Sequence, residues 1–185
     1  MRLFGERGYD ATSVAEIERA AGLTPGAGGL FHHFSSKEDV LRVGIARHLD
    51  RLDALRQIRG AVPPLGDLRA ELTLLARYVF SEMAEEQELL RILFTEARQR
   101  PELLADAVER IVRASFREFA EWLRRSTRGA AVNAEAVAAV ALGGLAYYRA
   151  AEALVDQPPV DVGEDEFIRT WVDMVVGYLS PGRTR

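Results

Sequence analysis

The sequence contains no cysteine. A disulfide framework and a cysteine-ligated zinc site are therefore excluded, and a reducing cytoplasm is the expected location. Long hydrophobic runs are lacking as well. The longest uncharged apolar stretch, residues 136–148, is shorter than the roughly 20 residues that a membrane-spanning helix needs. The first residues carry no apolar signal-peptide core, so we expect no membrane partner.

A strong positive charge is also lacking. The 185 residues carry a net charge of −4. Residues 1–50 hold six lysines and arginines against seven aspartates and glutamates, a local balance of −1. A surface that wraps nucleic acid along its whole length is therefore disfavoured, and any DNA contact has to come from a few placed groups.

What the sequence does contain is helical periodicity over almost its whole length, with 48% hydrophobic residues and no strand pattern. Ser13 to Glu16 form a capping box at the start of a short helix. Residues 36–59 predict one long helix, and the Pro/Gly-rich residues 60–66 break it from the next. The pattern predicts an all-α fold with about nine helices.

One glycine-rich stretch, residues 24–37, follows that short helix at the spacing of a helix-turn-helix. Thr24 is a good N-cap and Pro25 suits a first helical position, so a second helix is predicted to begin here. At its start, almost bare backbone amides suit an anion such as a phosphate, and they belong to Gly26, Ala27, Gly28 and Gly29. The alternative is a glycine-rich surface turn between two core helices.

The first 45 residues or so resemble the DNA-binding domain of the TetR family of transcriptional repressors. Residues 5–14 (GERGYDATSV) resemble the end of that family's first helix and the start of its second. Residues 20–24 resemble its turn, and residues 30–38 (LFHHFSSKE) resemble the signature around its recognition helix. Residues 46–185 resemble the family only in the number and order of their helices.

The resemblance implies an N-terminal three-helix helix-turn-helix DNA-binding domain over residues 1–46 and a C-terminal helical ligand-binding and dimerisation domain over residues 47–185. It implies a two-fold symmetric homodimer that places two such units in successive major grooves of a near-palindromic DNA operator. Lys37 matches the family's phosphate-contacting lysine. The expected DNA-binding residues are Ala15, Thr24, Pro25, Gly26, Ala27, Gly28, Gly29, Phe31, His32 and Lys37.

The sequence departs from the family pattern in three places. Two additional residues stand between Thr24 and Phe31, and the Gly-Ala-Gly-Gly run indicates a recognition helix that is short, irregular or ordered only on DNA. Phe31 replaces the usual tyrosine and cannot donate a phenolic hydrogen bond to a phosphate. The first helix is expected to lack its N-terminal half, through a different translation start or a truncated chain.

The resemblance also implies a small-molecule effector that binds the C-terminal domain and changes the spacing of the two DNA-binding units. Aromatic side chains there, with few polar anchors, favour a hydrophobic or aromatic effector. For any single one of them, a core position is the default interpretation at helical spacing. The expected ligand-binding residues are Tyr78, Met83, Phe94, Glu96, Phe116, Phe119, Trp122 and Tyr147.

The predicted helix that includes residues 136–148 is apolar nearly all round, so it needs burial on two sides. A second copy of the chain can supply the second cover, which favours a homodimer over a monomer. The expected dimer-interface residues are Gly143, Gly144, Tyr148, Trp171, Val175 and Tyr178.

The leading hypothesis is a ligand-responsive DNA-binding repressor, and the alternative is a dimeric helical binding or scaffold protein that has lost sequence-specific DNA binding. No nucleophile–base spacing or phosphate-binding loop points to an enzyme, so no catalytic residue and no cofactor are predicted. His32 and His33 point about 100° apart on a helix, and no ligand-type residue stands four residues on, so no metal site is predicted either.

Overall fold

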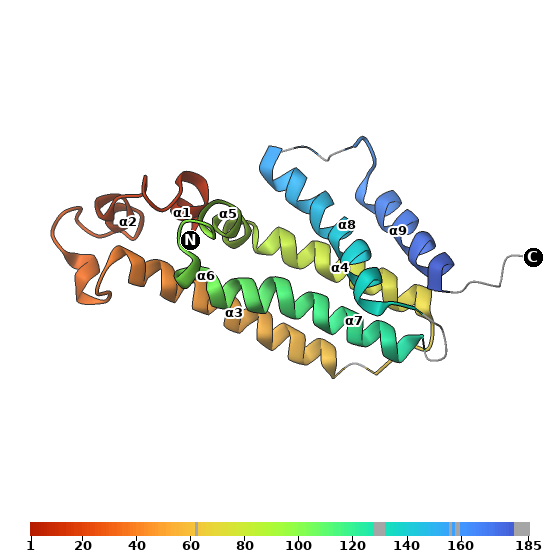
Figure 1. Ribbon diagram of the computed structural model, residues 1–185. Helices are drawn as coiled ribbons and strands as arrows, with labels where there is room; N and C mark the ends of the chain where they lie inside the picture. Colours follow the sequence, from red (N-terminus) through yellow and green to blue (C-terminus); the bar gives the residue numbers. More distant parts are fainter. Residues whose placement is uncertain (62, 128–131, 156, 158–159, 180–185) are drawn as a thin grey trace, which may run out of the picture. The chain divides into compact units, whose positions relative to one another are not determined.

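The computed structural model describes residues 1–61, 63–127, 132–155, 157 and 160–179, and every regular element in these ranges is a helix (Figure 1). The predicted all-α fold is confirmed. No helix in the same ranges combines the length and hydropathy needed to cross a bilayer.

The chain forms two compact units. Unit 1 combines Met1–Arg59 with Glu86–Ile111, and unit 2 combines Gly60–Glu85 with Val112–Arg185. The domain boundary predicted at residue 46 falls inside a long helix of unit 1. The assignment of DNA binding to residues 1–46 stays a prediction.

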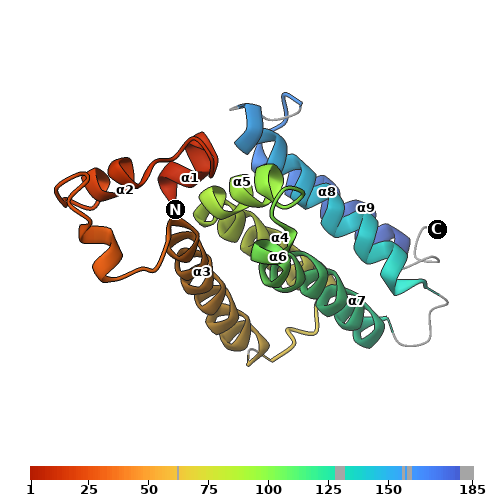
Figure 2. The same ribbon diagram turned by 60° about the vertical axis from the view of Figure 1, so that its left-hand side comes forward.

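Unit 1 is built from α1 (Arg2–Arg7), α2 (Val14–Ala20), the 3₁₀ turn η1 (Gly29–His32), α3 (Lys37–Gly60), α5 (Gln87–Glu96) and α6 (Pro101–Ala107), with η2 (Val108–Arg113) at its end. α1 lies against α5 (Figure 2). Gly5 permits this approach, because a Cβ there would lie 3.1 Å from the backbone oxygen of Glu88. The shared core of the unit includes Phe4, Leu41, Ile45, Leu49, Leu89, Ile92 and Leu104.

Unit 2 consists of α4 (Leu68–Glu85), α7 (Ala114–Ser126), α8 (Ala134–Val155) and α9 (Glu164–Leu179). Phe80 of α4 is 1% exposed and stacks on Tyr148 and Phe167, at 5.5 and 5.9 Å between ring centroids. Trp171 Nε1 of α9 donates to the carbonyl of Ala141 at 2.8 Å, which joins α9 to α8. Aromatic side chains therefore join α4, α8 and α9 in the core of unit 2, and α7 contributes Phe119, Ala120 and Leu123 to the same core.

Replacing Tyr148 with phenylalanine is expected to lower the stability of unit 2 modestly. The Tyr148 hydroxyl donates to the carbonyl of Val162 at 2.6 Å, and one such hydrogen bond contributes about 1 kcal/mol. Burial, and then the carboxylates of Glu152 and Glu164, raise the pKa of this phenol. A raised pKa in the folded state means that stability is lost as the pH rises above the unfolded value of about 10.

Thermal unfolding at pH 7 and at pH 10.5 measures both effects. The Tyr148→Phe variant should have a melting temperature roughly 2–4 °C lower at pH 7. It should also lose less stability than the wild type between the two pH values. An equal alkaline loss in both proteins would contradict the assignment of this titration to Tyr148.

Candidate nucleic-acid interface

α2 begins where the sequence predicts, because both hydrogen bonds of its capping box are formed. The Ser13 hydroxyl accepts from the amide of Glu16 at 3.3 Å, and the Glu16 carboxylate accepts from the amide of Ser13 at 2.8 Å. The hydrogen bonds from Ser13 hold the pKa of Glu16 below its usual range, and Arg7 adds to this effect. The start of α2 is thus fixed by local contacts alone.

Replacing Ser13 with alanine is expected to destabilise unit 1 by about 1 kcal/mol, the usual cost of losing an N-cap. The depressed pKa of Glu16 contributes stability above the unfolded value, which is lost as the pH falls through the folded value. Ser13→Ala should therefore flatten the loss of stability between pH 7 and pH 3. Thermal unfolding at both pH values tests this, with the exposed Ser81→Ala on α4 as the control. An unchanged acid profile would contradict the prediction.

After α2 the backbone does not form the predicted second α-helix. The expectation of a helix that begins at Thr24 is wrong. Residues 21–28 contain turns and bends, and the only regular element between α2 and α3 is the 3₁₀ turn η1. Gly26 and Gly28 adopt φ values of +78° and +75°, which lie outside the right-handed helical region. The recognition segment, residues 24–33, is therefore short and irregular, which was one of the predicted alternatives.

Glu18 organises the recognition segment. This glutamate of α2 is fully buried, and its carboxylate accepts from the amide of Gly26 at 2.7 Å and from the amide of Leu30 at 3.2 Å. Leu30 itself is 4% exposed, and the turn η1 that contains it packs against α2. The carboxylate thus occupies the amide of Gly26, one of the four that are predicted to suit a phosphate, and the amide of Leu30 just after them.

The role of Glu18 is not among the predicted ones, although the sequence carries a signal for it. Glu18 stands four residues after Val14, so it shares the inward face of α2, where a carboxylate requires donors. The glycine-rich segment that follows supplies those donors as backbone amides.

The structure brings most of the predicted DNA-binding residues together on the recognition segment. Phe31 is 53% exposed, so the aromatic ring points to solvent beside the buried Leu30. The exposed predicted residues are Thr24, Pro25, Gly26, Ala27, Phe31 and His32. The half-buried ones are Ala15 on α2, Gly28, Gly29 and Lys37. Lys37 lies outside the segment, at the first position of α3.

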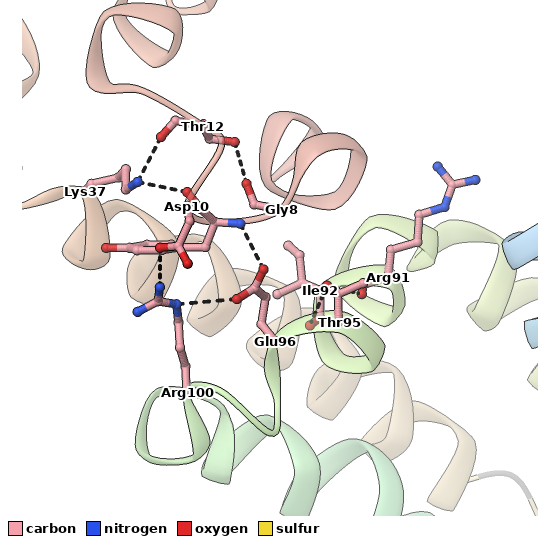
Figure 3. Close-up of polar contacts among 10 residues, drawn as sticks. Gly8, Asp10, Thr12, Lys37, Arg91, Ile92, Thr95, Glu96 and Arg100 are labelled. Atoms are coloured by element: carbon pink, nitrogen blue, oxygen red, sulfur yellow. Dashed lines mark hydrogen bonds and ion pairs between the residues drawn. The ribbon is translucent and has the colours of Figure 1, made fainter.

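Lys37 is one of four charged residues that lie around Tyr9. Together with Tyr9 they are here called the Tyr9 cluster, and the four are labelled in Figure 3: Asp10, Lys37, Glu96 and Arg100. The Lys37 ammonium donates to the carbonyls of Tyr9 and Thr12 at 2.8 and 2.9 Å. It also lies 4.2 Å from the centroid of the Tyr9 ring. The Arg100 guanidinium lies at the same ring, 3.9 Å from its centroid.

Glu96 and Arg100 complete the Tyr9 cluster from α5 and from the residue before α6. Glu96 is 6% exposed, and its Oε1 accepts from the amide of Tyr9 at 3.0 Å. Arg100 pairs with Asp10, and its Nε lies 3.4 Å from Glu96 Oε2. Burial raises the pKa of the Tyr9 phenol, against the opposing effect of Arg100, so the ring stays neutral between the two cations. Glu96, predicted to bind a ligand, accepts from the backbone amide of Tyr9, and its role toward a ligand stays a prediction.

The other predicted ligand-binding residues are divided between the two units. Phe94 of unit 1 and Tyr147 of unit 2 are exposed. Phe119 is buried and stacks on Trp122 at 5.7 Å and on Trp171 at 6.5 Å. Tyr78, Met83, Phe116 and Trp122 are half-buried in unit 2.

Unit 2 also carries a groove of about 440 Å³ between α4 and α9. Its floor is apolar and its sides are mostly charged, and none of the eight predicted ligand-binding residues lines it. The lining residues are Arg69, Thr73, Arg77, Asp165, Ile168, Arg169 and Val172.

Of the predicted dimer-interface residues, three lie inside the protomer. Tyr148, Trp171 and Val175 are 4%, 7% and 7% exposed and belong to the unit 2 core, because their side chains fill the space between α4, α8 and α9. Gly143 and Gly144 are half-buried, and Tyr178 is 61% exposed. Only these last three remain available to a partner.

The capped α2, the turn and recognition segment after it, and the long α3 follow one another in the order of a helix-turn-helix DNA-binding protein, with an irregular segment in place of the second helix. Comparison with known proteins agrees with this class. Residues 1–43 match the family model of the bacterial regulatory proteins of the tetR family. Residues 1–43 are therefore similar to the helix-turn-helix domain of the TetR family of transcriptional regulators.

A curated relative is the HTH-type transcriptional repressor Rv1474c of Mycobacterium tuberculosis, 37% identical over 70 residues. The match covers 37% of this chain and 36% of the repressor, so it spans about a third of that protein's length.

Solved structures match over nearly the whole chain. The TetR family transcriptional regulator PfmR from Thermus thermophilus is 27% identical, with a TM-score of 0.54, and the match covers 94% of this chain and 92% of PfmR. The fatty acid degradation regulator FadR from Bacillus halodurans is 19% identical, with a TM-score of 0.68 and coverage of 100% and 92%. FadR shares the fold of both units.

Proposed function

We propose that the protein is a homodimeric, cytoplasmic repressor that binds a near-palindromic DNA operator and leaves it when a small hydrophobic effector binds. The observation that carries the DNA-binding part is the recognition segment. Most of its residues are exposed, while Glu18 holds its backbone to α2 through the amides of Gly26 and Leu30.

The proposed readout of DNA follows from the exposed side chains. Ala27 and Phe31 offer apolar surface that suits the methyl groups of thymine in a major groove. His32 and Thr24 offer hydrogen-bonding groups that suit phosphate oxygens. With so few cations in residues 1–50, the salt dependence of binding should be shallow for a dimer.

Fluorescence anisotropy with the promoter DNA that flanks the protein's own coding region tests the proposal. We expect binding of the full chain that weakens as salt is raised and that exceeds binding to a shuffled duplex of equal length by at least roughly 1,000-fold. Equal affinity for both duplexes, or no binding, would overturn the repressor proposal.

The dimer is proposed from exposed apolar stripes on α8 and α9. Val140 and Tyr147 of α8 are 77% and 68% exposed, and Met174 and Tyr178 of α9 are 69% and 61% exposed. A Cβ added at Gly143 or Gly144 would meet no atom within 4 Å, so this part of α8 has room for a close partner. A two-fold contact between copies would cover both stripes at once.

The effector is proposed to bind unit 2 beside its aromatic side chains, and tryptophan fluorescence tests this. The chain has two tryptophans, Trp122 and Trp171, and both stack on Phe119. An aromatic or long-chain aliphatic compound that binds there should change their emission, raise the melting temperature and release operator DNA. Release of DNA without any change in emission would place the effector elsewhere.

A second function, a dimeric helical binding protein without operator recognition, is favoured by two observations. Glu18 already occupies the amides of Gly26 and Leu30, and Lys37 is engaged with backbone carbonyls. This function would be supported by a ligand that raises the melting temperature of a chain that binds both duplexes equally.

A further inference from the structure

We infer that Lys37, which the family resemblance assigns to phosphate contact, is a positioning residue: with Glu96 and Arg100 it holds residues 9–12 in the conformation that presents α2 to DNA. The structural part stands on the Tyr9 cluster alone. Its effect on DNA affinity rests on the proposed DNA-binding function.

The contacts of Lys37 leave it little freedom to reach a phosphate. An ammonium has three N–H donors, and two of them are directed at the carbonyls of Tyr9 and Thr12 at 2.8 and 2.9 Å. The charge also lies over the Tyr9 ring, at 4.2 Å from its centroid. Movement toward DNA would break two hydrogen bonds and leave two carbonyl groups without this donor.

Glu96 and Thr12 hold the same backbone segment through further contacts. Glu96 Oε1 accepts from the amide of Tyr9, and it reaches this position because residue 8 is glycine. A Cβ at Gly8 would lie 3.2 Å from that oxygen, and Gly8 adopts a φ of +81°. Thr12 is fully buried, and its hydroxyl lies 2.8 Å from the carbonyl oxygen of Gly8. Residues 8–12 are thus held from both sides.

The positions of Lys37 and Glu96 on their helices indicate that tertiary contacts, and not the helix dipoles, stabilise the two charges. Lys37 is the first residue of α3, where the positive end of the helix dipole disfavours a cation. Glu96 is the last residue of α5, where the negative end disfavours an anion. Both charges act against the dipole of their own helix, so the local sequence gives no reason for them. The contacts with Tyr9, Thr12 and Arg100 do.

Residues 9–12 lead directly into Ser13, the N-cap of α2, and α2 carries Glu18, which fixes the recognition segment. The capping box defines the residue at which α2 begins, and the Tyr9 cluster holds the backbone before that residue, so it sets the position of α2 within unit 1. The position of α2 in turn sets where the recognition segment lies. Loosening the cluster should lower DNA affinity although none of its members touches DNA.

The salt dependence of operator binding separates the two roles of Lys37. Removing one cation that contacts a phosphate lowers the slope of log K against log[salt] by about 0.9, so loss of both Lys37 side chains of a dimer would lower the slope by about 1.8 if they contacted phosphates. We expect Lys37→Met to weaken operator binding by roughly 10-fold, the equivalent of about one net hydrogen bond, with the slope unchanged. A slope lower by about 1.8 would overturn the positioning role. Arg98→Gln is the matched control, because it removes an exposed cation two residues after Glu96 in the chain. It should change neither the affinity nor the slope.

A double-mutant cycle tests whether the cluster acts as a unit. Glu96→Gln keeps the size of the side chain and removes the charge opposite Arg100. If Lys37 and Glu96 act through the same backbone segment, Lys37→Met combined with Glu96→Gln should weaken binding by clearly less than the product of the single effects. Strictly multiplicative effects would overturn the shared role.

Hydrogen exchange provides a readout that does not require DNA. The Tyr9 amide, which donates to Glu96, should exchange several-fold faster in both Lys37→Met and Glu96→Gln than in Arg98→Gln. If the wild type fails to distinguish operator from shuffled DNA, the proposed function fails while this measurement still decides on the cluster. Unchanged exchange of the Tyr9 amide in both variants would overturn the inference.

Discussion

Replacing Glu18 with alanine is expected to disorder the recognition segment and to lower operator affinity by roughly 30-fold or more. The carboxylate accepts from the amides of Gly26 and Leu30, and Glu18 itself is fully buried. Without it, both amides lose their acceptor, which costs about 2–4 kcal/mol of local stability in total. Binding must then supply the free energy that orders residues 24–33.

Hydrogen exchange at Gly26 and Leu30, together with anisotropy on operator DNA, measures both parts of this prediction. The amides should lose protection in Glu18→Ala, and Glu18→Gln should lie between the two proteins because an amide side chain keeps one acceptor oxygen. The exposed Glu121→Ala on α7 is the control and should change neither quantity. Full protection of both amides in Glu18→Ala would contradict the assigned role.

The outcome also discriminates between the two proposed functions. In a repressor, loss of protection and loss of affinity should occur together. In a binding protein without operator recognition, the amides lose protection while ligand binding by unit 2 is unaffected.

The second large effect is expected from a charge placed on the exposed stripe of α8. Val140→Glu should convert the dimer into a folded monomer and lower operator affinity by roughly 100-fold or more, because two linked half-site contacts become independent. Val140 is 77% exposed in the protomer, so the carboxylate remains hydrated there. In a dimer it would be buried without a partner, at a cost of several kcal/mol.

Light scattering coupled to size exclusion measures the mass, and thermal unfolding checks that the monomer is folded. Leu74→Glu on α4 is the matched control, since Leu74 is 58% exposed and lies outside the α8 and α9 stripes. It should leave the mass unchanged. A dimer that persists in Val140→Glu would show that α8 is not the contact between copies.

The sequence was a good guide wherever the cause of a structure is local. Ser13 and Glu16 stand three residues apart, so their capping box could be predicted and is formed. The long helix predicted for residues 36–59 is α3, because its apolar spacing and its cap are both local signals. The irregular recognition segment was one of the predicted alternatives, on the basis of its glycines.

The roles of individual polar residues could not be predicted in the same way. Lys37 was expected at a phosphate and Glu96 at a ligand, yet both hold the same backbone segment around Tyr9. Their partners stand 25 to 28 residues away from Lys37 and 87 residues away from Glu96. Sequence periodicity shows which face of a helix is buried, and it does not show which distant backbone group meets a charged side chain there.

The same limit applies to the aromatic residues of unit 2. Tyr148 and Trp171 were expected between copies, and the structure places them in the protomer core, while Tyr147 and Met174 are exposed. Adjacent positions on a helix differ by about 100°, so a small error in the inward direction exchanges core for surface.

The sequence by itself thus determined the all-α class, the similarity of residues 1–43 to the TetR family and the capped α2, because each depends on residues within a few positions of one another. Its glycines predicted a short or irregular recognition helix only as one alternative. Only the tertiary structure decided that Glu18 holds the amides of the glycine-rich stretch and that Lys37 and Glu96 meet at Tyr9. Buried charges seek whichever donors and acceptors the folded chain brings near, and that choice is made by packing and not by spacing.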